Sequence, residues 1–285
     1  MSENIKIAVD AMGGENSPKK VIEGIIINHK ENKDILYNIF GDLEMIEPLL
    51  PKNYNKKIFN IVNTKNKILD TDSPLSAAKK GKDTSMWLTI QSVKNNESDV
   101  AISAGNTGAL FVISKLNLQM IKNIDKPALS ALWPNKKNFN IVLDLGLNIE
   151  CNEKNLIDFS IMGSSLFKSL YPNDNATVAL LNIGSEELKG NEVIKKAYQS
   201  LQKEINKNFD FYGYIEGNHI MDGKANVIVT DGFTGNIALK TAEGTAKFIT
   251  DSLKESLNES FLSKFSILFS YISLKKFKNK LDPRK

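Results

Sequence analysis

The sequence predicts an α/β fold with a mostly parallel sheet that is covered by helices on both faces. Short apolar runs rich in β-branched residues alternate with longer segments in which apolar residues recur at spacings of three and four, as at Val21, Ile22, Ile25 and Ile26. Continuous apolar strands separated by amphipathic helices are typical of parallel sheets, whose strands are buried on both faces. The chain has 285 residues, 41% of them hydrophobic, which is enough for a large core.

Seven strands are expected, each a β-branched run bounded by glycine, proline, asparagine or aspartate. They are Ile5–Asp10, Leu36–Gly41, Ile58–Thr64, Val100–Ala104, Ile141–Gly146, Thr177–Ile183 and Val227–Asp231. Helical patterns fill most of the intervals, and Ser17-Pro18 predicts the start of the first, with the serine hydroxyl as N-cap. Since no internal repeat or long linker interrupts this order, we expect one domain over residues 1–285.

The composition favours a cytoplasmic protein. Cys151 is the only cysteine, so no intrachain disulfide can form. The start of the chain, MSENIKIAVDAMGG, lacks the basic and apolar regions of a secretory signal. No run approaches the ~18 apolar residues of a membrane span.

The charge of the chain is concentrated at its end. The formal net charge is +4, but the last 25 residues carry +6 and the first 260 carry −2. This asymmetry predicts an acidic partner or an anionic surface for the tail. A nucleic-acid binder would more often carry its cations across a whole face, so we expect no nucleic-acid partner.

Four predicted strand ends are rich in glycine and small polar residues. They are Asp10–Gly14, Gly105–Ala109, Gly146–Asn148 and Asp231–Asn236. In an open parallel sheet, ligands bind where the carboxyl ends of the strands lead into helices. Glycines let the backbone approach an anion, and the N–H groups of a helix start point towards it. Together the four segments predict a polyanionic or phosphate-containing ligand.

Several other kinds of site are not indicated. The chain has no G-x-G-x-x-G after a strand, no phosphate-binding loop with lysine at the required spacing and no G-x-S-x-G elbow. His29 and His219 lie far apart in the sequence, and neither has a second ligand at metal spacing. Glu150 and Glu153 flank Cys151 and would raise its thiol pKa. We therefore expect no metal, no cofactor and no enzyme nucleophile.

The segment from Gly184 to Asn191 has two interpretations. Lys189 within it could bind phosphate or stabilise a developing oxyanion. It could equally belong to an exposed charged loop that precedes a helix. Composition alone favours the exposed loop.

These motifs occur together, in one order, in a known family. The matching segments are IAVDAMGG, PLSAAKKGKDTSM, DVAISAGNTGAL, KPALSALWP, LDLGLN, VALLNIGSEELKGN and VIVTDGFTGNIALKTAEG. From the first strand to the last residue, the sequence resembles the bacterial phosphate acyltransferases of phospholipid synthesis, the PlsX family.

The resemblance implies transfer of a fatty acyl group from acyl carrier protein to inorganic phosphate, giving acyl phosphate. It also implies a Rossmann-like α/β/α fold, as in phosphotransacetylases and dehydrogenases of the isocitrate and isopropylmalate type. A homodimer without metal or cofactor is expected. The product would pass to a membrane-bound glycerol-3-phosphate acyltransferase, so we expect a cytoplasmic protein that associates peripherally with the membrane.

The resemblance also assigns site residues. Phosphate and substrate contacts fall on Asp10, Gly13, Gly14, Ser103, Gly105, Asn106, Thr107, Gly108, Asn148, Thr234 and Gly235. Lys189 matches the family pattern E-x-x-K-G-N and becomes a candidate for the oxyanion, together with Asn236. Asp231 is expected to orient its neighbours rather than act as a base, since phosphate is already ionised enough to attack.

The tail, residues 257–281, is expected to form an amphipathic basic helix. Its predicted contact residues are Phe265, Leu268, Phe269, Lys275 and Lys276. Such a helix can lie on an anionic membrane, hold the acidic carrier protein, or pack in a core or dimer interface.

Two alternatives to the carrier-protein reaction are a phosphotransacetylase that uses a coenzyme A thioester and an inactive scaffold. The scaffold is considered because most members of the family continue beyond the position of Lys285.

Overall fold

The computed structural model describes residues 4–79, 81–203, 209–258 and 272–276. The chain forms two compact units, residues 1–121 (unit 1) and 122–285 (unit 2), and each has a sheet of its own. The expectation of a single acyltransferase domain over residues 1–285 stays a prediction, with these units as its parts.

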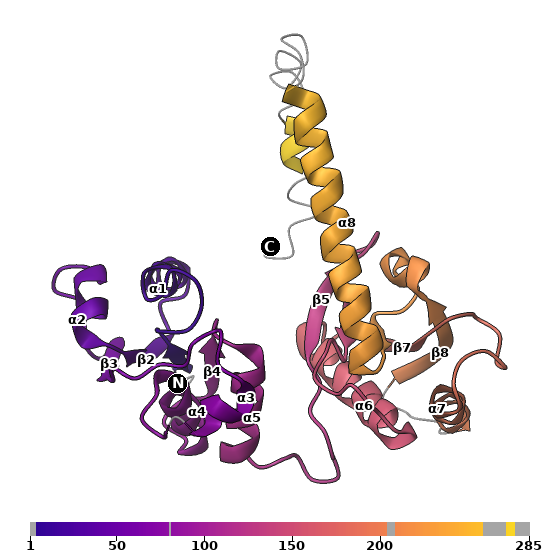
Figure 1. The fold of residues 1–285 in the computed structure, drawn as a ribbon, viewed down its shortest axis with the longest axis horizontal. Coiled ribbons are helices and arrows are strands. Elements are labelled where there is room, and N and C mark those ends of the chain that lie inside the picture. The colour runs from indigo at the N-terminus through magenta and orange to yellow at the C-terminus, as the bar shows by residue number, and fades with distance from the viewer. Residues whose placement is uncertain (1–3, 80, 204–208, 259–271, 277–285) are drawn as a thin grey trace. The chain divides into compact units, whose positions relative to one another are not determined.

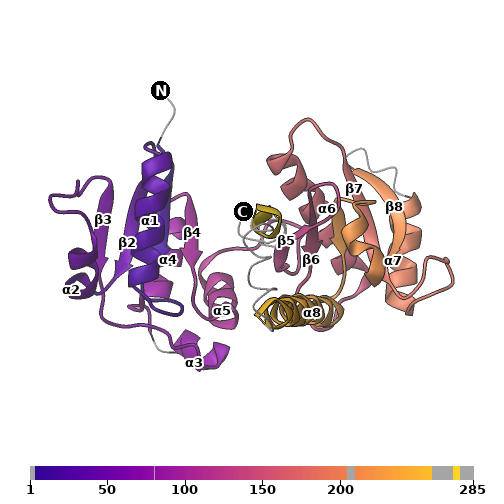
Figure 2. The same cartoon turned by 90° about the horizontal axis from the view of Figure 1, so that it is seen from above.

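Unit 1 is built on a parallel sheet of four strands in the order β3-β2-β1-β4. The strands are β1 (Lys6–Asp10), β2 (Leu36–Gly41), β3 (Phe59–Asn63) and β4 (Val100–Ser103). The helices are α1 (Lys19–Glu31), α2 (Leu43–Ile46), the 3-10 turn η1 (Glu47–Leu49), α3 (Pro74–Lys79), α4 (Ser85–Lys94) and α5 (Thr107–Asn117). Figures 1 and 2 show these elements in unit 1.

Helices α1 and α4 of unit 1 belong to two separate clusters of buried apolar side chains. Ile22 and Ile25 of α1 pack with Val9 and Ile39 from the strands. Helix α4 contacts β1, β2 and β4, and its buried side chains cluster with those of α5. Both layers fix the strands, so the loops at the carboxyl edge start from a rigid base.

Unit 2 is built on a five-stranded sheet in the order β5-β6-β9-β7-β8. The strands are β5 (Ser130–Pro134), β6 (Phe139–Leu143), β7 (Ala176–Asn182), β8 (Phe209–Glu216) and β9 (Val227–Val229). The helices are α6 (Glu153–Leu170), α7 (Glu192–Lys203), the 3-10 helix η2 (Gly217–Asp222) and α8 (Gly232–Asn258). Strand β5 is antiparallel to β6, and the other pairs are parallel.

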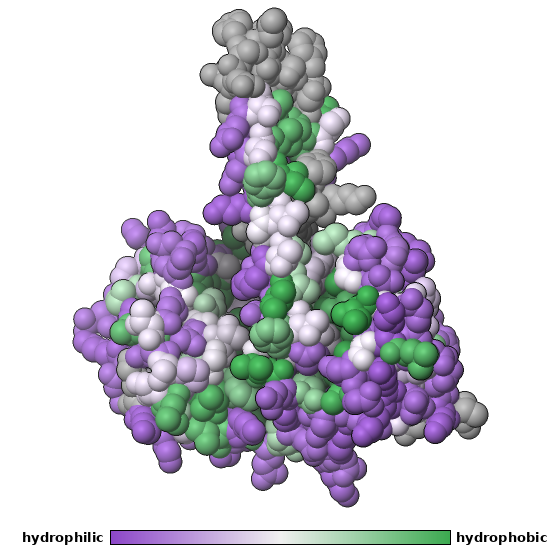
Figure 3. All heavy atoms as spheres, turned by 45° about the vertical axis from the view of Figure 1, so that its right-hand side comes forward, coloured by the Kyte–Doolittle hydropathy of each residue, from purple (hydrophilic) through white to green (hydrophobic). Residues whose placement is uncertain are grey.

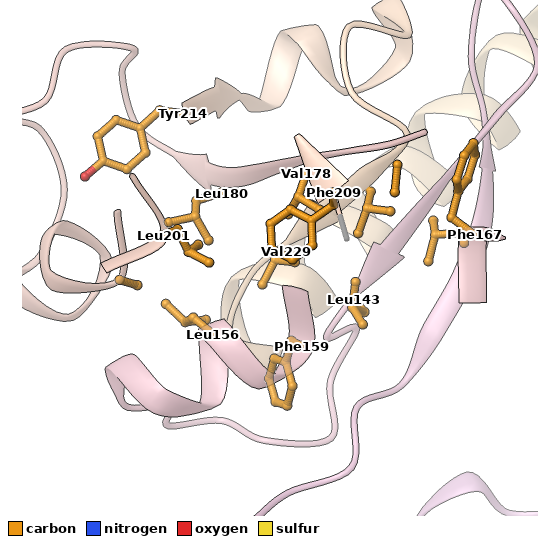
Figure 4. Close-up of a cluster of buried hydrophobic side chains, with 14 residues drawn as sticks. Leu143, Leu156, Phe159, Phe167, Val178, Leu180, Leu201, Phe209, Tyr214 and Val229 are labelled. Atoms are coloured by element: carbon orange, nitrogen blue, oxygen red, sulfur yellow. The ribbon is translucent and has the colours of Figure 1, made fainter. Parts of the chain in front are cut away.

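The core of unit 2 lies mainly between the sheet and helices α6 and α7. Leu156 and Phe159 of α6 and Leu201 of α7 meet strand residues such as Leu180 and Val229 (Figure 4). A second cluster, which includes Val142 and Ile228, packs against Ala238, Leu239 and Ala242 at the start of α8. Helices therefore cover the sheet on both faces, as the sequence predicts.

The fold class and all seven predicted strands are confirmed, with ends that differ by at most three residues. Strands β5 and β8 were not predicted. The expected N-cap at Ser17 is wrong, because its hydroxyl donates to the carbonyl groups of Gly13 and Gly14 instead of accepting from the helix. Ser17 thus holds the loop after β1 against the start of α1.

Helix α8 extends beyond the sheet that its first turns cover (Figure 1). It carries exposed apolar side chains towards its far end, among them Phe248 and Ile249 (Figure 3). Of the predicted segment 257–281, Lys275 and Lys276 are exposed in a helical stretch over 272–276, while Phe265, Leu268 and Phe269 lie outside the described residues. Within the described ranges, no helix is long and apolar enough to cross a membrane.

Candidate active site

The carboxyl edge of unit 1 brings together the strand ends of β1 and β4. Asp10 pairs in register with Ser103, so the loops that follow both strands start side by side. The Asp10 carboxylate is buried and accepts hydrogen bonds from the Ser103 hydroxyl at 2.7 Å and from the Met12 N–H at 3.2 Å. The Ser103 hydroxyl in turn accepts from the Gly105 N–H at 3.1 Å. Asp10 therefore ties the two loops to one another.

Glycines are required where these two loops touch. A Cβ on Gly13 would lie 2.8 Å from the Gly105 nitrogen, and a Cβ on Gly14 would lie 2.6 Å from the Ala104 carbonyl oxygen. Gly14 also has a φ of 87°, in the left-handed region. Side chains at these positions would force the loops apart.

The start of α5 is capped by Asn106, whose side-chain oxygen accepts from the Ala109 N–H at 3.0 Å. The Asn106 amide nitrogen donates to the carbonyl groups of Asp70 and Asp72. Both polar atoms of the Asn106 side chain are therefore already hydrogen-bonded within the protein. If Asn106 binds phosphate, as predicted, its backbone is the freer part of the residue. The N–H groups of Thr107 and Gly108, in the first turn, have no acceptor within the helix.

In unit 2, three loops share one edge of the sheet. Leu143 pairs with Val229, and Val229 pairs with Leu180, so β6 and β9 end at the same level and β7 continues two residues further. The loops after β6 and β7 carry Asn148 and Lys189, and the stretch Asp231–Asn236 leads from β9 into the start of α8. All the unit 2 residues predicted for the site therefore lie along one edge.

The loop after β6 is organised by Asp144, a residue that the sequence analysis did not single out. Its buried carboxylate accepts from the backbone N–H groups of Leu129, Gly146, Leu147 and Asn148 and from the Asn148 side-chain amide. An aspartate where a strand ends, with glycine two or three residues later, is common to Asp144 and Asp10 and could have signalled this role.

The start of α8 is fitted closely to this loop. Asp231 accepts from both the N–H and the hydroxyl of Thr234, at 2.9 and 2.8 Å, and so caps the helix. The Gly232 N–H donates to the Asn148 carbonyl at 2.8 Å. A Cβ on Gly235 would lie only 1.9 Å from the Asp144 carbonyl oxygen, so no other residue fits there without a backbone shift.

Asn236 and Lys189 are exposed polar side chains of this edge. Asn236 lies beside Gly146, where an added Cβ would approach its side chain to 3.3 Å. Lys189 is 53% exposed, and its ammonium group lies 3.9 Å from Glu186. Its stem passes over Gly184, since a Cβ there would lie 3.1 Å from the Lys189 Cγ. Both side chains can reach a ligand outside the edge.

Cys151 follows this edge but is poorly suited to be a nucleophile. Burial raises the pKa of its thiol to about 11, and the nearby charges of Asp144 and Asp231 act in the same direction. The prediction that the thiol pKa is raised agrees with the structure. The predicted cause, the charges of Glu150 and Glu153, is wrong, since burial and two other carboxylates raise it. Among the residues that the structure describes, no group of three or more His, Cys, Asp and Glu side chains could hold a metal ion.

Comparison with protein families identifies close relatives over the whole chain. The family model described as "Fatty acid synthesis protein" matches residues 5–285. A phosphate acyltransferase of Pelagibacter ubique (strain HTCC1062) is 65% identical over 288 residues, covering 100% of this chain and 85% of the relative. A phosphate acyltransferase of Paramagnetospirillum magneticum (strain ATCC 700264 / AMB-1) is 40% identical, covering 100% and 81%.

Solved structures show the same fold at much lower identity. A phosphotransacetylase from Streptococcus pyogenes matches with a TM-score of 0.62 and 15% identity, covering 87% of this chain and 83% of the other. The EutD phosphotransacetylase from Staphylococcus aureus matches with a TM-score of 0.60 and 14% identity, covering 86% and 83%.

Proposed function

The chain belongs to the phosphate acyltransferase family, and on this premise we propose that it transfers a fatty acyl group from acyl carrier protein to inorganic phosphate. One observation carries the mechanism. Lys189 lies exposed on the loop after β7, and Asn236 lies exposed near the start of α8, which follows β9; β7 and β9 are neighbouring strands of one sheet. A lysine and an amide at one sheet edge can stabilise negative charge on a reacting oxygen.

The reaction needs no enzyme nucleophile, because phosphate attacks. A phosphate oxygen forms a bond to the thioester carbonyl carbon, and the carbonyl oxygen becomes an oxyanion held by Lys189 and Asn236. When the intermediate collapses, the carbon–sulfur bond breaks and the sulfur leaves as a thiolate, which takes a proton from water. Catalysis then rests on positioning and on electrostatic stabilisation.

The carboxyl edge of unit 1 supports phosphate binding. Backbone N–H groups are contributed by Gly13, in the loop after β1, and by Gly108, in the first turn of α5. The Thr107 hydroxyl is exposed and makes no hydrogen bond within the described residues, so it is available to an anion. The helix α5 starts at this edge, and its dipole favours negative charge there.

Asp231 has a structural part in this proposal. Its carboxylate is engaged by Thr234, which fixes the first turn of α8 and with it Asn236 two residues further on. This supports the orienting role over a role as general base.

Turnover of single variants tests the assignment. Lys189→Ala and Asn236→Ala should each lower phosphate-dependent thiol release by about 10²-fold or more if they hold the oxyanion. Lys240→Ala is a matched control, since Lys240 is also an exposed lysine of unit 2 that is paired with a glutamate three residues away. Losses within a few-fold for Lys189→Ala and Asn236→Ala would remove these roles.

The acyl donor is tested by comparing acyl carrier protein and coenzyme A thioesters of one chain length. We expect the carrier-protein substrate to have the higher kcat/KM. A preference for the coenzyme A thioester would favour phosphotransacetylase activity, and no turnover with either would favour a scaffold.

The partners of the tail are part of the same proposal. We propose a cytoplasmic homodimer that binds anionic membrane through the basic segment and hands its product to a membrane-bound glycerol-3-phosphate acyltransferase. Lys275 and Lys276 are exposed, as this requires. Co-sedimentation with anionic liposomes should fall when Phe265 and Phe269 are changed to aspartate, and unchanged binding would rule out this segment.

A further inference from the structure

Strand β7 ends in Asn182, a polar side chain that is only 7% exposed. It lies beneath the loop that carries Lys189. Polar side chains are seldom buried at a strand end unless they hold other groups in place, because burial without hydrogen bonds costs free energy.

The Asn182 amide closes this loop at two points. Its nitrogen donates to the carbonyl of Gly184 at 3.2 Å and to the carbonyl of Lys189 at 3.1 Å. Between these points the Lys189 N–H donates to the Glu186 carbonyl at 3.0 Å, which forms a turn. The backbone of Lys189 is therefore held on both sides, by its own N–H and by its carbonyl.

At the next position, residue 190, only glycine fits against the Asn182 side chain. The φ of Gly190 is 93°, in the left-handed region, and a Cβ there would lie 2.4 Å from the Asn182 side-chain oxygen. That oxygen is buried and has no hydrogen-bond partner among the described residues. The loop thus packs directly on the amide, and Asn182 is not replaceable by a larger side chain.

We propose that Asn182 is a positioning residue for Lys189 in phosphate acyltransfer. It fixes the backbone from which the lysine reaches the reacting oxygen, without touching substrate itself. This inference rests on the proposed function of Lys189. It predicts that Asn182 affects turnover only while Lys189 is present.

The test is a double-mutant cycle with Asn182→Asp and Lys189→Ala. Aspartate matches asparagine in shape but cannot donate to the two carbonyl groups. Asn182→Asp alone should lower kcat about 10- to 30-fold, because the backbone that carries Lys189 loses both hydrogen bonds from the amide. In the Lys189→Ala background the same change should alter kcat less than about twofold, because coupled residues are not additive.

Asn140→Asp is the matched control. Asn140 is also a buried strand asparagine of unit 2, and its amide nitrogen donates to the carbonyl of Ile220, in η2. It lies on β6, where its partner strand residue is Trp133, rather than under the Lys189 loop. Its loss should lower thermal stability, and any effect on kcat should be the same factor with and without Lys189.

The outcomes separate this inference from the proposed function. A normal kcat for Lys189→Ala would remove the role of Lys189, and this inference with it. A slow Lys189→Ala enzyme in which Asn182→Asp costs the same factor as in the wild type would overturn this inference alone, as would an unchanged kcat for Asn182→Asp. If Asn182→Asp does not fold, Gly190→Ala disturbs the same contact from the loop side and is tested in the same cycle.

Discussion

Replacing Asp144 by asparagine should destabilise unit 2 by about 3 kcal/mol. One carboxylate oxygen accepts from the backbone N–H and the side-chain amide of Asn148, both at 2.7 Å. The other accepts from three backbone N–H groups, which an asparagine oxygen can keep. The new NH2 group then faces two donors. Each lost bond to a charged group is worth about 1.5–3 kcal/mol, and relief of the buried charge offsets part of the loss.

The same substitution at Asp10 is the internal comparison. Asp10 accepts from one backbone N–H, at Met12, and from the Ser103 hydroxyl. An asparagine oxygen can keep the Met12 bond, and the hydroxyl can rotate to accept from the new NH2 group. Asp10→Asn should therefore cost about 1 kcal/mol or less, although the residue type and its burial match those of Asp144.

Each unit has one buried tryptophan to report its unfolding, Trp87 in unit 1 and Trp133 in unit 2. In a Trp87→Phe background, the fluorescence of Trp133 reports the urea unfolding of unit 2 and so the effect of Asp144→Asn. In a Trp133→Phe background, the fluorescence of Trp87 reports unit 1 and so the effect of Asp10→Asn. The reasoning is that the groups facing Asp144 can only donate, whereas the Ser103 hydroxyl facing Asp10 can also accept. Equal losses of unfolding free energy at the two sites, or a loss below about 1 kcal/mol for Asp144→Asn, would refute it.

Three further outcomes follow from single groups. Asp231→Ala removes the cap of α8 and should cost about 1 kcal/mol in urea unfolding, with turnover within a few-fold of wild type if the carboxylate only orients; a loss of 10³-fold would indicate a base. Hydrogen bonds from Lys136 and His219 lower the pKa of Asp222 to about 2, so the stabilisation is complete above about pH 4 and lost as pH falls towards 2. The Tm values of wild type and Asp222→Asn should converge over that range, and a constant difference would contradict the ion pair. Since burial raises the pKa of Cys151 to about 11, iodoacetamide should modify the folded protein far more slowly at pH 8 than the urea-unfolded chain, and Cys151→Ser should keep its turnover.

Seven parallel strands were predictable because each is a buried run of β-branched residues that can be recognised from its own composition. Strand β5 was missed because it ends in Pro134 and exists through antiparallel pairing with β6, a tertiary effect. Strand β8 was missed because Gly213, with a φ of 100°, breaks the pattern where its pairing with β7 shifts in register. Such features depend on the neighbouring strand rather than on local propensity.

The glycine-rich strand ends were predictable in the same way, since glycine and small polar residues mark them in the sequence. The residues that organise them were not. Asp144 and Asn182 read as the ends of apolar strands, and their importance comes from the carbonyl and N–H groups that the folded loops bring to them. Composition favoured an exposed loop for Lys189, and only the family resemblance favoured its chemical role over that interpretation.

The buried side chains beneath the loops have a consequence for ligand affinity. Asp144 fixes the backbone from Gly146 to Asn148, and Asn182 fixes Gly184 and Lys189, through hydrogen bonds of the protein itself. The conformational entropy of these loops is therefore lost during folding, where the buried hydrogen bonds compensate for it. Few conformations of these loops remain to be lost when the acyl substrate binds. Its interactions with Lys189 and the neighbouring backbone therefore contribute almost fully to the binding free energy.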